Sequence, residues 1–143
     1  MEKPTIKIGN REIPMTMTSW ELATIQEEIG CTVGQLRDEV FGITQNMETG
    51  EYSFGIIEDG AKIKRFGTLL KILGNAGLEE DGQEPDLTDK WILRNMKPGL
   101  IMVYVMAASA VISEAMKMET EEEKDGPVDE ILAEENRKKE PES

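Results

Sequence analysis

The chain has 143 residues and a formal net charge of −13, with one cysteine and no histidine. This length suits a single domain with a tail. One cysteine excludes an intramolecular disulfide, and the lack of histidine removes the commonest metal ligand and general base. The acidic balance argues against nucleic-acid binding, because phosphate contacts depend on Lys and Arg. These features favour a protein of the reducing cytoplasm.

The negative charge is concentrated at one end. Residues 119–143 contain eleven acidic and four basic side chains, so this segment carries −7 and the preceding 118 residues carry −6. We therefore predict a hairpin plus helical domain at 1–118 and a disordered acidic tail at 119–143. Within the tail, residues 128–139 have the composition of a transient helix.

The first fifteen residues predict a β-hairpin. Two short apolar strands, at residues 5–8 and 12–15, flank Gly9 and Asn10. This dipeptide tolerates the positive φ angles of a two-residue hairpin turn. Because Pro14 has no N–H to donate, the second strand should lie at an edge at this point.

A capped helix should follow the hairpin. Thr18 and Glu21 have the spacing of a capping box, and Gly30 is the expected end of the helix. Its buried stripe is predicted to consist of Leu22, Ile25 and Ile29. Trp20 lies outside this stripe, and we expect it to pack on the hairpin rather than to anchor a partner.

The middle of the chain alternates between clear and weak signals. Residues 32–41 predict a short helix that ends at Gly42, and residues 43–60 read as a loop with a short strand or helix. A third, amphipathic helix is expected at residues 61–76, with Gly77 as its stop. The acidic residues 79–86 lack the alternating oxygen ligands of a calcium loop, so they are predicted to be a solvated linker.

The last predicted helices contain the most apolar stretch of the chain. Thr88 should cap a short helix, and Pro98 should begin a long one that runs to residue 118. Lys97 and Glu114 bracket 16 uncharged residues, which is short for a membrane span of about 20 residues. This helix either fills the core or presents a partner surface. For the second alternative, Met102, Tyr104 and Met106 are the candidate contacts.

No catalytic, cofactor or metal motif is found. The chain has no phosphate-binding glycine loop, dinucleotide fingerprint or serine-hydrolase elbow. Cys31 lacks a histidine partner and is interpreted as a buried or incidental thiol. The only basic cluster before the tail is Lys62, Lys64 and Arg65. We therefore predict a protein that is no enzyme, needs no cofactor, and binds neither nucleic acid nor membrane.

The order of these elements resembles the opening of the small tail assembly chaperones of long-tailed bacteriophages. The resemblance rests on the hairpin turn Gly9-Asn10-Arg11-Glu12 and on the helix end Glu27-Glu28-Ile29-Gly30, and it extends more weakly to Met118. It implies a mainly α fold: an N-terminal β-hairpin followed by a compact bundle of about four to five helices.

The resemblance also implies a function. Such a chaperone binds and solubilises the tape-measure protein before the tail tube polymerises, and tail-tube protein is a further expected partner. It would act in the cytoplasm of the bacterial host, form homo-oligomers, and be absent from the mature virion. In that family a ribosomal slip yields a longer form, for which Lys138 and Lys139 are the candidate site. The alternatives are a structural virion component, such as a tail-tube or head-tail connector subunit, and an unrelated helical adaptor domain.

Overall fold

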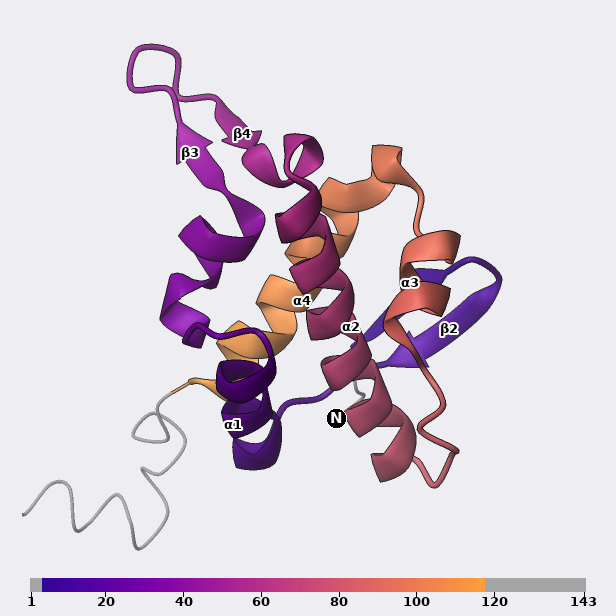
Figure 1. Cartoon of the computed structure of the whole chain (residues 1–143). Coiled ribbons are helices and arrows are strands. Elements are labelled where there is room, and N and C mark those ends of the chain that lie inside the picture. Colours follow the sequence, from indigo (N-terminus) through magenta and orange to yellow (C-terminus); the bar gives the residue numbers. More distant parts are fainter. Residues whose placement is uncertain (1–3, 118–143) are drawn as a thin grey trace, which may run out of the picture.

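The computed structural model describes residues 4–117 and confirms a mainly α fold with an N-terminal β-hairpin (Figure 1). The α-helices are α1 (Ser19–Glu28), α2 (Gly60–Glu80), α3 (Asp89–Asn95) and α4 (Ile101–Ala115). The strands are β1 (Thr5–Ile8), β2 (Arg11–Pro14), β3 (Ile43–Gln45) and β4 (Tyr52–Phe54). Short 3-10 or π turns complete the list for the described residues: η1 (Val33–Gln35), η2 (Arg37–Phe41), η3 (Gly55–Glu58) and η4 (Pro98–Leu100).

The N-terminal hairpin forms where the sequence predicts it. Strands β1 and β2 are antiparallel and pair Ile6 with Ile13, and Gly9 adopts a φ of +64° in the turn. The second strand begins and ends one residue earlier than predicted. Alternate residues of β1 and the end of β2 are buried, so the hairpin packs one face onto the helices.

Helix α1 begins with the predicted capping box. The backbone N–H and the hydroxyl of Thr18 both donate to Glu21 Oε1, at 2.7 and 2.6 Å. The helix ends at Glu28 with Ile29 as its C-cap, and the predicted stop Gly30 follows with a φ of +88°. The prediction for Trp20 is wrong, because its side chain is 77% exposed. Trp20 lies five residues before Ile25, about 140° around the helix from the buried stripe, and therefore points away from the core.

Helix α2 runs through the middle of the molecule, with α1 and η2 on one side, α3 and the hairpin on the other, and α4 behind it in Figure 1. The prediction that Gly77 stops this helix is wrong, since α2 continues to Glu80. A Cβ on Gly77 would lie only 2.0 Å from the carbonyl oxygen of Pro14. The glycine is thus needed for close approach of the helix to β2 rather than for a left-handed turn.

The weakly predicted segment between η2 and α2 contains both a hairpin and a helical turn. Strands β3 and β4 pair Ile43 with Phe54, and η3 follows directly. Gly42 ends η2 with a φ of +60°, and its carbonyl accepts a hydrogen bond from the N–H of Gly55 at 2.7 Å. The hairpin projects away from the helices in Figure 1.

The last two helices begin as predicted. Thr88 Oγ1 accepts a hydrogen bond from the N–H of Trp91 at 3.1 Å, and Pro98 is the first residue of η4, which leads into α4. Helix α4 ends at Ala115, before the predicted end at residue 118. The predicted acidic tail, 119–143, and the pair Lys138 and Lys139 lie outside the described residues.

Candidate protein-binding surfaces

Helix α4 has two apolar faces, and only one of them is buried. Its inner face contributes Ile101, Tyr104, Val105, Ala108, Val111 and Ile112 to the core. On the opposite face, Met102 is 50% exposed, Val103 57% and Met106 65%. The sequence left open whether this helix is core or partner surface, and the structure gives it both features.

The candidate residues therefore divide between the two faces. Met102 and Met106 lie together on the outside, as their i, i+4 spacing predicts. The prediction for Tyr104 is wrong, because this side chain is 3% exposed. Tyr104 is two positions from each methionine, which places it about 200° around the helix, on the core side.

Sequence reasoning missed part of the exposed face. Val103 and Ala110 are exposed beside the two methionines, at the spacing i, i+1, i+4 and i+8 that keeps residues on one side of a helix. We call Met102, Val103, Met106 and Ala110 the α4 stripe. Between Lys97 and Glu114 the sequence has no charged residue, so the stripe offers only apolar contact.

The composition of this helix also suits a bilayer. The 18 residues Pro98–Ala115 are long and apolar enough to cross a membrane by length and composition, which for a single helix is weak evidence. The inner face of α4 packs in the same hydrophobic core as α1, α2 and the hairpin. A spanning α4 would have to leave that core and expose the apolar side chains that it covers.

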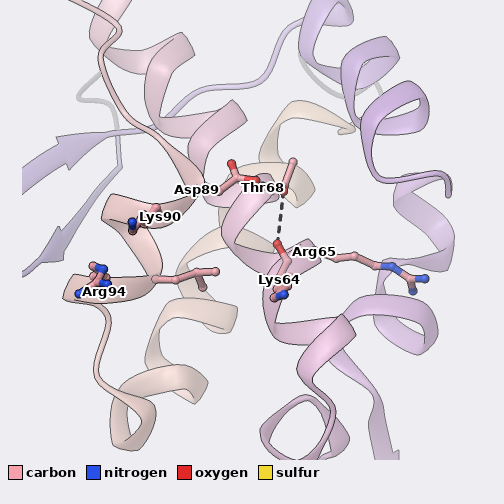
Figure 2. A pocket seen from close by; sticks show the side chains of 7 residues that line it. Lys64, Arg65, Thr68, Asp89, Lys90 and Arg94 are labelled. Atoms are coloured by element: carbon pink, nitrogen blue, oxygen red, sulfur yellow. Dashed lines mark hydrogen bonds between the residues drawn. The ribbon is translucent and has the colours of Figure 1, made fainter.

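A second surface feature is a cleft between α2 and α3 that encloses about 570 Å³ (Figure 2). Its lining consists of Lys64, Arg65, Thr68, Asp89, Lys90, Leu93 and Arg94. Figure 2 shows Lys90 and Arg94 on α3, across the cleft from Lys64 on α2. A Cβ on Gly67 would lie 2.8 Å from Leu93 Cγ, so the two helices are in close contact at the floor of the cleft.

Two of the charged side chains that line the cleft, Arg65 and Asp89, have partners within the protein. Arg65 points away from it and donates to the carbonyl of Glu39 at 3.2 Å, as does Lys62 at 3.1 Å. Asp89 accepts a hydrogen bond from Thr68 at 2.7 Å and lies 3.3 Å from Lys71 Nζ.

Three cations remain at the cleft. Within residues 4–117, no ion pair or hydrogen bond engages the ammonium groups of Lys64 and Lys90 or the guanidinium of Arg94. The hydrogen bond drawn in Figure 2 runs from Thr68 Oγ1 to the backbone carbonyl of Lys64, at 3.3 Å. The α2/α3 cleft, defined by these three residues and Leu93, is therefore cationic at its rim and apolar at its floor. Sequence analysis identified Lys64, but Lys90 and Arg94 join it only through the packing of α3 on α2.

The described residues offer little to metal or nucleophilic chemistry. Among residues 4–117, no three His, Cys, Asp or Glu side chains are placed to hold a metal ion. Cys31 is partly buried. Burial, and then the charge of Glu39, raises the pKa of the Cys31 thiol above its ordinary value, which keeps it protonated and weakly nucleophilic at neutral pH.

Comparison of the chain with protein-family models, curated proteins and solved structures finds no match.

Proposed function

We propose that this chain is a tail assembly chaperone that binds the phage tape-measure protein and keeps it soluble before the tail tube polymerises. The proposal starts from the resemblance in the hairpin and first helix. The observation that carries it furthest is the α4 stripe, an exposed, uncharged helix face with two methionines on a chain whose net charge is −13.

The α4 stripe suits a partner that is a long amphipathic helix. Such a helix can lay its apolar face along another apolar helix face, with contacts spaced at i, i+3 and i+4. Unbranched Met102 and Met106 adapt to side chains of different shape, which helps a surface that meets many similar but non-identical segments. Each bound copy would remove exposed apolar area that otherwise drives aggregation of the partner.

The direct test is capture of a tape-measure fragment by the full chain. We expect the double variant Met102→Asp, Met106→Asp to lose most binding, because it puts two charges into an apolar contact. Met47 is the matched control, since it is 91% exposed on the β3–β4 loop and outside the stripe. Met47→Asp should bind normally, and circular dichroism should show that both variants are folded.

Three results would contradict this proposal. Full binding by the folded double variant would move the contact away from α4. Recovery of the chain in purified virions, at a stoichiometry like that of other structural proteins, would favour the alternative of a virion component. A chaperone should instead be found in infected-cell lysate and be absent from particles. Flotation of the full chain with lipid vesicles, lost in the same double variant, would point to a membrane role for α4.

A further inference from the structure

The α2/α3 cleft is lined by basic side chains, although the described part of the chain is acidic overall. Residues 4–117 contain 17 acidic and 11 basic side chains, a net charge of −6. Three of these eleven cations surround one cleft and have no partner among the described residues. Lys64, Lys90 and Arg94 are exposed to solvent, so an acidic segment that lies against them can form ion pairs without breaking existing ones.

The cleft also selects for more than charge. Leu93 is half-buried at its floor, where α2 and α3 touch at Gly67. The aliphatic stems of Lys64 and Lys90 extend the apolar surface toward the charged rim. A fitting segment therefore combines a few adjacent apolar side chains with several carboxylates, and a small anion alone would leave the floor uncovered.

One segment of this chain has that composition. After Lys117 the sequence contains Val, Ile or Leu only at Val128, Ile131 and Leu132. Their spacing of i, i+3 and i+4 is that of one helix face. Four carboxylates stand among and just after them, so residues 128–135 carry a charge of −4 with no basic residue.

When extended, the connection between Lys117 and Val128 is about as long as the body is wide. Ten residues, 118–127, separate Lys117 from Val128, and eleven steps of extended chain span about 36 Å at ~3.3 Å per residue. A body of this size has a diameter of about 35 Å, from a radius of gyration of ~13 Å.

We propose that residues 128–135 dock in the α2/α3 cleft of the same molecule. Ile131 and Leu132 would cover Leu93, and the four carboxylates would face Lys64, Lys90 and Arg94. This inference does not depend on the proposed chaperone function. Its consequence is that the cationic cleft is closed to other acidic segments until one of them displaces residues 128–135.

The test is zero-length carbodiimide cross-linking of the full chain, mixed in equal amounts with ¹⁵N-labelled full chain and read by mass spectrometry. We expect cross-links from Lys64 and Lys90 to residues 129, 130, 134 and 135, with both peptides of the same isotope. Lys7 and Lys97 are exposed lysines outside the cleft and serve as references. Equal yields at all four lysines would overturn the proposal. Peptides of mixed isotope would show docking between two copies and overturn it equally.

Two variants separate docking from general attraction between an acidic tail and a lysine. Ile131→Ser with Leu132→Ser keeps every charge, and we expect it to lower the Lys64 and Lys90 cross-links about tenfold because apolar burial is lost. Arg94→Glu should lower them comparably, whereas Arg37→Glu, an exposed arginine on η2, should leave them unchanged. Unchanged cross-links in the serine variant would show that the cleft does not recognise residues 131 and 132.

Discussion

From hydropathy alone, α4 would be expected at the centre of the molecule and α2 at its surface, but the structure places α2 at the centre. Helix α4 is the most apolar stretch of the chain, yet it lies at the periphery and exposes the α4 stripe. Helix α2 contains several lysines and glycines, yet ten of its residues are buried and the other elements pack around it. Hydropathy therefore indicates which helices have apolar surface to bury, while close packing decides which helix occupies the centre.

Glycine residues explain how α2 reaches the centre. A Cβ added at Gly67, Gly74 or Gly77 would lie within 3 Å of Leu93, Leu87 or Pro14, respectively. None of these three glycines has a positive φ. They cost the helix some intrinsic stability, and in return they allow α3 and the hairpin to approach its backbone closely.

The largest expected effect follows from the closest of these contacts. Gly77→Ala should destabilise the protein by about 3 kcal/mol or more, because the new Cβ meets a backbone carbonyl that cannot move without the hairpin. Chemical denaturation monitored by circular dichroism would measure this change. Gly60→Ala is the control on the same helix, since nothing lies within 4 Å of that position. Equal stability of the two variants would show that α2 does not press on Pro14.

Substitutions on the two faces of α4 should lower the free energy of unfolding by different amounts. Val105 is fully buried, and Val105→Ala should cost about 2 kcal/mol through lost burial and a residual cavity. Met106→Ala, one position away on the exposed stripe, should stay within about 0.5 kcal/mol of the parent. Denaturant midpoints of the two variants measure the difference. Similar losses for both would mean that the stripe is covered in solution, by a second copy or by another part of the chain.

A smaller effect is expected where α1 ends beside α2. Gly30→Val should destabilise by roughly 1–2 kcal/mol, because a β-branched residue resists the φ of +88° found there. A Cβ added there would meet no atom within 4 Å beyond its chain neighbours, so backbone strain is the expected cause. Gly34→Ala, at a glycine with an ordinary φ, should change the unfolding midpoint little. An unchanged midpoint for Gly30→Val would mean that the left-handed cap does not hold in solution.

Local signals were predictable from the sequence, and contacts between distant segments were not. The turn at Gly9, the caps at Thr18 and Thr88 and the helix start at Pro98 depend on neighbouring residues, and the structure confirms them. Gly77 was misread because a glycine that ends a helix and a glycine that admits a strand look alike in one sequence.

The candidate surfaces show the same contrast between features set by neighbouring residues and features set by contacts between distant segments. The i, i+4 spacing predicts that Met102 and Met106 share a face, but it does not tell which face is buried, and Tyr104, also named as a candidate contact, lies on the buried face. The α2/α3 cleft was missed because Lys64 lies 26 residues from Lys90 and 30 from Arg94. Helical spacing links Lys90 to Arg94, yet only the packing of α3 on α2 brings Lys64 to them.

The smallest expected effect concerns an exposed contact at the same hairpin that Gly77 touches. Arg11 Nη2 lies 2.8 Å from Asp86 Oδ1, and both side chains are partly exposed. The hydrogen bond from Arg11 is the main cause that lowers the pKa of Asp86 below its ordinary value of 3.8. Because the folded form holds this proton less readily than the unfolded chain, the contribution to stability is complete above pH 3.8 and is lost as the pH falls through the lower folded pKa.

Arg11→Gln should therefore raise the pKa of Asp86 toward 3.8 and leave the unfolding midpoint at pH 7 nearly unchanged, since exposed ion pairs contribute little. Carboxyl-detected NMR titration of Asp86 measures the first effect, and Arg37→Gln, which removes an exposed arginine elsewhere, is the control. An unshifted pKa in Arg11→Gln would show that the pair does not form in solution. A loss at pH 7 as large as that of Gly77→Ala would mean that the contact of Arg11 with Asp86 stabilises the hairpin as much as its close packing on α2 does.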